Sequence, residues 1–124
     1  MKKAVLFVSH GSRLPQTEQE VRDYVDLLRK RSDVPIFEHA FLEITRPSIS
    51  EGIDICVKKG AIQIVVLLNF LNSGKHVEED IPWIINEARR KYPQVRIEIT
   101  RPVGQHERII DLFLDMIANG FVRQ

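Results

Sequence analysis

Residues 64–83, IVVLLNFLNSGKHVEEDIPW, decide the fold of this chain because they hold a strand, a polar loop and the start of a helix in direct succession. The apolar, β-branched run that ends at residues 72–74 predicts a strand buried on both faces, followed by a turn. Acidic residues 78–80 fit the first turn of a helix, where carboxylates complement the positive end of the helix dipole. His76 is therefore expected on a strand-to-helix loop, where open α/β sheets place their ligand sites.

Two other polar side chains follow predicted strands in the same way. His10 comes directly after the apolar residues 3–9, and Glu43 lies at the end of a strand predicted over residues 36–44. His10 and Glu43 are 33 residues apart, as are Glu43 and His76, and this interval is close to the roughly 30 residues of one β-α-β step. If these strands are neighbours in a parallel sheet, two imidazoles and a carboxylate converge on one ion.

The strand and helix patterns alternate along the whole chain. Strands are expected over residues 3–9, 36–44, from 64 onward and over 95–100, and helices from 15 to about 32, 48 to about 59, 78 to about 91 and 105 to 118. Ser48 and Glu51 have the spacing of a helix capping box. Four such units predict a doubly wound α/β fold, with a four-stranded parallel sheet and helices on both faces. The three-residue site requires the strand order 2-1-3-4, which places the ends of strands one, two and three side by side.

Length and composition exclude several classes of protein. A chain of 124 residues with 44% hydrophobic residues predicts a single domain over residues 1–124. The net charge of +1 comes from scattered charges, so we expect no nucleic acid partner. The apolar run near the N-terminus is too short for a signal peptide, and no stretch suits a membrane span. With Cys56 as the single cysteine, we expect a cytoplasmic protein and an unreactive thiol.

The predicted site residues favour a divalent transition metal. Imidazole and carboxylate ligands suit cobalt, nickel, iron or zinc. A lone loop histidine is more often a surface residue than a ligand, and Glu43 alone can be a helix-entry carboxylate. The equivalent placement of His10, Glu43 and His76 is what favours a metal site. His39 is expected to pack within its strand, and His106 to lie in the first turn of the last helix.

Basic residues follow all four predicted strands. They are Arg13, Arg46, Lys75 and Arg101. Together with the helix N-termini at the same edge of the sheet, they predict a ligand that carries several negative charges.

Three separated segments resemble one family. SHGSR, AFLEITRPSISEGI and FLNSGKHVEEDIP are similar to the sirohydrochlorin chelatases, the class II tetrapyrrole chelatases. The resemblance covers nearly the whole chain, in order, and fits the short single-lobe form or one half of a two-lobe relative. It implies a chelatase-like (flavodoxin-like) fold, with His10, Glu43 and His76 as the catalytic and metal-binding residues.

The resemblance also implies an activity. The expected enzyme is a sirohydrochlorin cobaltochelatase or ferrochelatase, a lyase that inserts a divalent metal into sirohydrochlorin in cobalamin or siroheme biosynthesis and releases two protons. The metal (Co²⁺, Fe²⁺ or Ni²⁺) is a substrate, no organic cofactor is expected, and nickel is less favoured because the chain has no histidine-rich loop. The residues expected to bind the tetrapyrrole are Arg13, Arg46, Ser73, Gly74 and Lys75.

The last predicted helix is apolar around more of its circumference than one sheet face covers. We therefore expect a homodimer, with the tetrapyrrole cleft between two copies.

Two alternatives stay open. A metal-binding or tetrapyrrole-binding module would use the same histidines without turnover. A histidine phosphatase-like enzyme also begins with a histidine after its first strand, but here Ser9 replaces the arginine that such an enzyme needs for phosphate. Nucleotide-binding folds are disfavoured because the sequence has neither G-x-G-x-x-G nor a P-loop.

Overall fold

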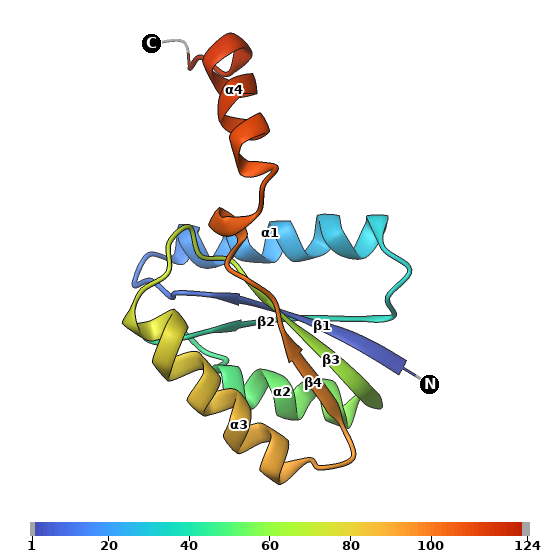
Figure 1. Ribbon diagram of the computed structural model, residues 1–124. Coiled ribbons are helices and arrows are strands. Elements are labelled where there is room, and N and C mark those ends of the chain that lie inside the picture. Colours follow the sequence, from blue (N-terminus) through green and yellow to red (C-terminus); the bar gives the residue numbers. More distant parts are fainter. Residues whose placement is uncertain (1, 123–124) are drawn as a thin grey trace.

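Alternating strands and helices build the chain from four β-α units (Figure 1). The computed structural model describes residues 2–122. The strands are β1 (Lys2–Ser9), β2 (Ile36–Phe41), β3 (Ala61–Leu68) and β4 (Arg96–Ile99). The helices are α1 (Pro15–Arg31), α2 (Ile49–Lys58), α3 (Ile81–Lys91) and α4 (Ile109–Asn119), with a π-helical turn η1 (His76–Asp80) and a 3-10 turn η2 (Val103–Gln105).

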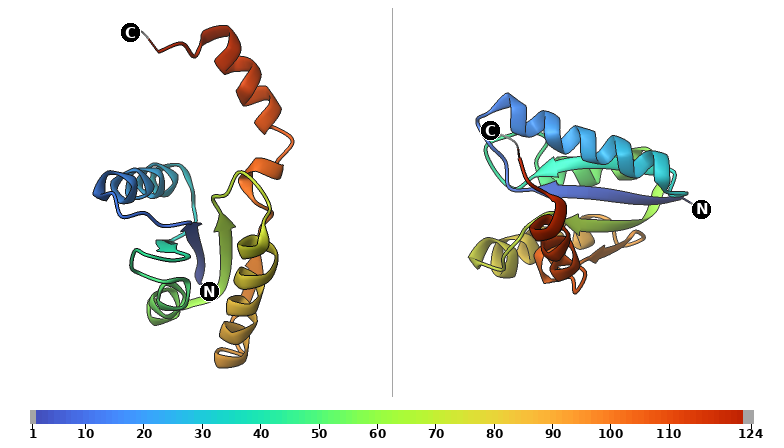
Figure 2. Two further views of the ribbon diagram at one scale, coloured as in Figure 1. Left: turned by 90° about the vertical axis from the view of Figure 1, so that its left-hand side faces the viewer. Right: turned by 90° about the horizontal axis from the view of Figure 1, so that it is seen from above.

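The sheet has the predicted order. All four strands are parallel and follow the order β2-β1-β3-β4, so β1 lies between β2 and β3. Helix α1 covers one face of the sheet, while α2 and α3 cover the other (Figures 1 and 2). The C-terminal ends of β1, β2 and β3 therefore lie side by side at one edge, as the site prediction requires.

The start of α2 confirms the predicted capping box. The Ser48 hydroxyl accepts a hydrogen bond from the Glu51 backbone N–H at 3.2 Å, and the Glu51 carboxylate accepts one from the Ser48 N–H at 2.9 Å. The Arg46 guanidinium bonds the same carboxylate, and this bond, followed by the Ser48 N–H, lowers the pKa of Glu51 to about 2. The three-residue spacing of Ser48 and Glu51 in the sequence thus predicted the start of α2 correctly.

The hydrophobic core lies mainly between the sheet and helices α2 and α3. Leu6, Ile53, Ile64 and Ile85 are fully buried there. Cys56 belongs to the same cluster, and burial raises the pKa of its thiol to about 12, which favours the protonated, less reactive form.

The α1 side of the sheet is covered less completely. Val5, Phe7, Val25 and Phe37 form a smaller buried cluster beneath α1. In β3, however, alternate side chains point toward the α1 side, and those at residues 63, 65 and 67 are only half-buried. The prediction that the third strand is buried on both faces is therefore wrong.

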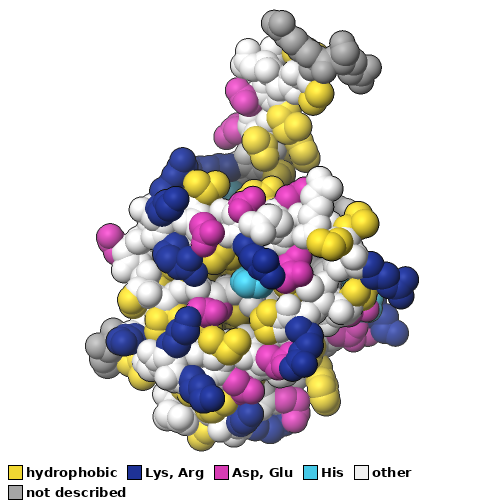
Figure 3. Space-filling model, turned by 180° about the vertical axis from the view of Figure 1, so that it is seen from behind, with side chains coloured by type: hydrophobic (Ala, Val, Ile, Leu, Met, Phe, Trp, Pro, Cys, Tyr) yellow, Lys and Arg dark blue, Asp and Glu magenta, His cyan; other side chains and the backbone are white. Residues whose placement is uncertain are grey.

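Helix α4 explains this difference because it projects away from the sheet instead of covering it (Figures 1 and 3). None of its residues is buried, and it begins at Ile109, four residues later than predicted. Of the helices in residues 2–122, none combines the length and the apolar character that crossing a membrane requires.

Candidate functional site

His10 and Glu43 are brought together by backbone pairing that continues past the ends of β1 and β2. The N–H of Leu42 donates to the Ser9 carbonyl at 2.9 Å, and the N–H of Glu43 donates to the His10 carbonyl at 3.0 Å. Gly11 has a φ of +111°, and a Cβ at this position would lie 1.9 Å from the Glu43 carbonyl oxygen. Only glycine permits this close approach of the two loops.

The side chains of His10 and Glu43 form a hydrogen-bonded pair. Nε2 of His10 donates to Oε1 of Glu43 at 2.8 Å, and the two side chains are 51% and 46% exposed. The pair is therefore preorganised by the backbone yet open to solvent, so a ligand can reach it.

His76 comes from the third strand-to-helix connection. It is the first residue of the π-helical turn rather than a loop residue, which corrects the predicted placement. Its Nδ1 donates to Oδ2 of Asp80 at 2.6 Å, so in the neutral ring the free lone pair is on Nε2. The His76 ring lies edge-on to the His10 ring, with 5.8 Å between the ring centroids.

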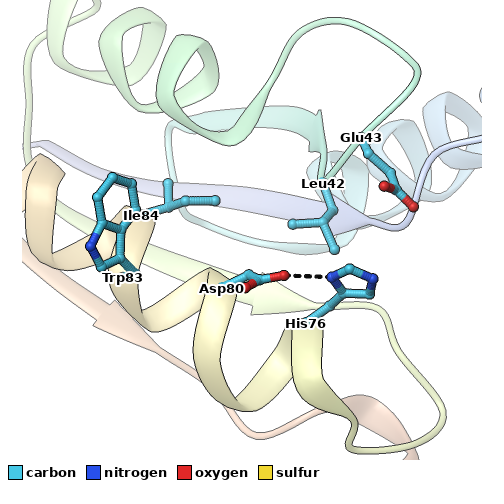
Figure 4. Close-up of a pocket in the computed structure, with 6 residues that line it drawn as sticks. All are labelled: Leu42, Glu43, His76, Asp80, Trp83 and Ile84. Atoms are coloured by element: carbon cyan, nitrogen blue, oxygen red, sulfur yellow. Dashed lines mark hydrogen bonds and ion pairs between the residues drawn. The ribbon is translucent and has the colours of Figure 1, made fainter.

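A cavity of about 330 Å³ opens beside these groups (Figure 4). It is lined by Leu42, Glu43, His76, Asp80, Trp83 and Ile84. Figure 4 shows the bonded His76 and Asp80 facing Leu42 and Glu43 across the opening, with Trp83 and Ile84 farther along α3. The cavity thus joins an apolar wall to a polar end that carries imidazole and carboxylate groups.

The three predicted metal ligands are adjacent, but they are arranged as pairs. His10 bonds Glu43, and His76 bonds Asp80. Within residues 2–122, no group of three or more His, Cys, Asp or Glu side chains is close enough together to hold a metal ion. One ring nitrogen of each histidine is hydrogen-bonded to its carboxylate partner, so the site consists of two imidazole–carboxylate pairs side by side.

The predicted basic residues divide into two groups. The side chains of Arg13 and Lys75 are exposed and make no ion pair in the described part of the chain, whereas Arg46 is paired with Glu51 at the start of α2. Figure 3 shows Lys and Arg side chains around a surface histidine with acidic side chains between them, not one continuous basic patch. Of these three residues, Arg13 and Lys75 are therefore better able than Arg46 to bind an anionic ligand.

The loop before His76 is tied to turn η2. The Ser73 hydroxyl accepts a hydrogen bond from the Gln105 side chain, and the N–H of Gly104 donates to the Phe70 carbonyl at 3.0 Å. Gly74 has no neighbouring atom within 4 Å of the position a Cβ would take. Ser73 therefore has a structural partner, while Gly74 leaves open space beside the site.

The two other histidines lie outside this arrangement. His39 is half-buried in β2 and edge-on to Phe41, and burial lowers its pKa, which confirms that it packs within the strand. His106 precedes α4, so its predicted place in the first helical turn is wrong, and its Nδ1 accepts a hydrogen bond from the Arg108 N–H at 3.0 Å.

Comparison with known proteins identifies the family of this fold and site. The model of the CbiX family matches residues 4–119, which is nearly the whole chain. The chain belongs to the CbiX family. This result confirms the family and the fold class that the sequence segments indicated.

Named relatives of this CbiX chain are chelatases of two lengths. The sirohydrochlorin ferrochelatase of Priestia megaterium is 36% identical over 92% of this chain but only 43% of its own length. The sirohydrochlorin cobaltochelatase of Methanothermobacter thermautotrophicus is 31% identical over 96% of this chain and 93% of its own length. The crystal structure of the sirohydrochlorin chelatase SirB from Bacillus subtilis subspecies spizizenii in complex with cobalt superposes with a TM-score of 0.86, at 34% identity, over 96% of this chain and 51% of that one. The chain thus spans about half the length of several curated relatives.

Four residues of the CbiX site were missed by the sequence analysis. They are Leu42, Asp80, Trp83 and Ile84. Asp80 was detectable, because it lies four residues after His76 at a predicted helix start, where such residues share one face. The apolar residues carried no such signal, since a cavity wall and an ordinary helix face have the same composition.

Proposed function

We propose that this chain is a sirohydrochlorin chelatase that inserts cobalt or iron, in preference to nickel, into sirohydrochlorin and releases two protons. The observation that carries the proposal is the pairing of His10 with Glu43 and of His76 with Asp80, with the two rings 5.8 Å apart beside an apolar cavity. The same activity is supported by the names of relatives, both those about twice as long as this chain and those of about the same length.

Metal delivery needs ligands that bind an ion and then release it. Nε2 of His76 has a free lone pair when the ring is neutral, because Asp80 occupies Nδ1. At His10, an ion bound through Nε2 would replace the hydrogen that Glu43 now accepts, and it would meet the Glu43 oxygen in the same place. A site that is not already closed into a rigid cage suits an ion that must be passed on as a substrate.

Proton removal uses the same groups. Insertion of a divalent metal displaces two pyrrole protons, and acceptors within hydrogen-bond reach accelerate such transfers. Glu43 is one acceptor. His76 is the other, because its Nε2 can take a proton while the Asp80 carboxylate stabilises the imidazolium that results.

The macrocycle is bound by the cavity wall and the basic side chains around it. A flat tetrapyrrole packs its apolar face against Leu42, Ile84 and the 66%-exposed Trp83. Its carboxylates reach Arg13 and Lys75, two exposed cations of the strand-to-helix connections that make no ion pair within residues 2–122. Arg46, Ser73 and Gly74 were also predicted to contact the substrate; because Arg46 and Ser73 are bonded elsewhere, we assign them the smaller part.

We further propose that the chain acts as a single chelatase domain, as a homodimer, in the cytoplasm, and that it supplies cobalamin or siroheme biosynthesis. The cavity is near the lower end of ligand-pocket volumes, about 300–1,000 Å³, so a macrocycle extends beyond it toward a second copy. The buried single cysteine is compatible with a reducing compartment.

The test is an absorbance assay of purified protein with sirohydrochlorin and each of Co²⁺, Fe²⁺ and Ni²⁺. We expect catalytic amounts of protein to convert an excess of sirohydrochlorin, and His10→Ala or His76→Ala to lose most of this turnover while keeping the fold. His106→Ala is the matched control, because His106 lies outside the site. Binding without turnover by the unmodified protein would instead identify a metal or tetrapyrrole carrier.

A further inference from the structure

Helix α4 lacks the packing that a helix of its length needs. It has 11 residues, none buried, and packs chiefly against turn η2. Isolated helices shorter than about 12–15 residues are marginal in water. The stability of α4 therefore has to come from a surface that covers it.

The apolar surface of α4 is too broad for a single contact. At about 100° per residue, its apolar side chains span an arc of about 200°. Ile109 and Leu112 are at one edge of this arc and line a cavity together with residues of α1 and β3 of their own chain. Ile110, Leu114 and Ile117, which are 59%, 57% and 70% exposed, form the opposite side, and Figure 3 shows apolar side chains gathered on the projecting helix.

A complementary groove lies between α1 and β3. It has a volume of about 510 Å³. Its apolar lining includes Phe7, Tyr24, Leu27, Leu28, Leu67 and Leu71. The lining is open to solvent, since the side chains of Tyr24, Leu27 and Leu71 are 54%, 50% and 62% exposed. The neighbouring strand β3 nevertheless has the composition of a strand that is covered on both faces. The groove is the part of the sheet that a helix following the fourth strand would ordinarily cover.

The helix of the same chain is directed away from this groove. Gly104 of η2 is held by its hydrogen bond to the Phe70 carbonyl, and a Cβ there would lie 1.7 Å from the Leu71 carbonyl oxygen. Only the first turn of α4, through Ile109 and Leu112, reaches one end of the groove. The remaining length of the groove is open to another helix.

The charges of the helix and the groove are complementary. Asp111 and Asp115 form the polar stripe of α4, and the helix has no basic residue. The last turn of α1 is basic, and its Arg31 lines the groove. Within residues 2–122, Arg31, Asp111 and Asp115 make no ion pair, so these charges are available to a partner.

We infer that α4 of one copy occupies the α1–β3 groove of a second copy, and that the second copy does the same in return. A twofold axis makes the two contacts identical, and each helix would bury the Ile110, Leu114 and Ile117 side that its own chain leaves exposed. This inference specifies the contact of the proposed homodimer and does not depend on the metal chemistry.

Cross-linking between two differently tagged chains tests the exchange. One chain carries Leu28→Cys and the other Ile117→Cys, and a short bis-maleimide is added to the mixed, re-equilibrated proteins. Cys56 stays unlabelled in the folded protein because it is buried and its pKa is raised to about 12. We expect a covalent product that carries both tags.

The matched control replaces Leu28→Cys by Lys58→Cys on α2, which covers the opposite face of the sheet. This pair should give no product above background. If instead a chain that carries both Leu28→Cys and Ile117→Cys closes only on itself, its own α4 fills the groove and the exchange is wrong. Absence of any α1–α4 cross-link overturns the proposal as well.

Sedimentation equilibrium without metal or tetrapyrrole gives an independent readout. Ile117→Glu should produce monomers, whereas Asn119→Glu, which adds the same charge to the polar stripe, should leave the dimer intact. Arg31→Glu should weaken dimerisation by about fivefold, and Asp115→Arg in the same chain should restore it. A monomeric unmodified protein at micromolar concentration would refute the contact, while loss of chelatase activity alone would not bear on it.

Discussion

The Asp80 carboxylate accepts a hydrogen bond from Nδ1 of His76 at 2.6 Å, and this bond determines which nitrogen of His76 faces the rest of the site. Carboxylates that orient a histidine in this way typically change metal affinity or activity by about 10–100-fold when they are removed. Sequence reasoning assigned Asp80 only to a helix start, so its role in the site comes from the structure.

Asp80→Asn should therefore lower kcat by about 10–100-fold while the KM for the macrocycle changes little. The amide can rotate its NH₂ toward Nδ1 and select the wrong tautomer, which moves the lone pair away from Nε2. Steady-state kinetics and calorimetric Co²⁺ titration check this expectation. Glu79→Gln is the control, because it removes a neighbouring exposed carboxylate; an equal loss in both variants would contradict an orienting role.

Gly11→Ala should disrupt both stability and insertion. The new Cβ would lie 1.9 Å from the Glu43 carbonyl oxygen, at a φ of +111° that alanine rarely adopts. We expect a loss of roughly 2 kcal/mol in the free energy of unfolding and a displaced His10–Glu43 pair. Urea unfolding measures the first effect. Gly74→Ala, where the added methyl group meets open space, should leave stability nearly unchanged.

Trp83→Ala should raise the KM for sirohydrochlorin more than it lowers kcat. Trp83 lines the cavity but is not hydrogen-bonded to the histidines, so it contributes binding rather than chemistry. Trp83→Phe should restore much of the affinity because it keeps an aromatic face. A change confined to kcat would remove Trp83 from macrocycle binding; Leu14→Ala, at an exposed apolar residue outside the cavity, serves as the control.

The capping box at α2 predicts a specific loss of stability in acid. The bond from Arg46, and then the Ser48 N–H, lower the pKa of Glu51 from 4.5 to about 2 in the folded protein. Its contribution to stability is therefore fully present above pH 4.5 and is lost as the pH falls toward about 2. Glu51→Gln should flatten the pH dependence of urea unfolding in this window. Glu20→Gln, at an exposed position of α1, should leave that dependence as it is in the unmodified protein.

The sequence predicted the frame of this protein well because local signals determine it. Apolar strands at regular intervals predicted the parallel sheet, the convergence of His10, Glu43 and His76 predicted its strand order, and the Ser48–Glu51 spacing predicted a helix start. The 33-residue interval also predicted that His10 and Glu43 meet, which their 2.8 Å hydrogen bond confirms. The assignment of metal ligands to His10, Glu43 and His76 stays a prediction.

The features that failed depend on packing between distant segments. The β3 composition indicated burial on both faces, but whether Leu67 is covered depends on the direction in which α4 leaves the sheet. The chain enters α4 after Gly104, whose close approach to the Leu71 carbonyl is a tertiary contact without a sequence pattern. The missed Asp80 is a different case, because His76 and Asp80 are only four residues apart and their spacing places them on one helix face.

Turn η2 has a mechanical consequence for the site. Gln105 bonds Ser73, and Gly104 bonds Phe70, so the segment that leads to His76 is fastened to the segment that leads into α4. Any displacement of α4 is therefore transmitted through η2 to the loop that carries His76, whereas His10 and Glu43 are anchored to the sheet by their own backbone pairing. One side of the site is fixed, and the position of the other responds to whatever holds the last helix.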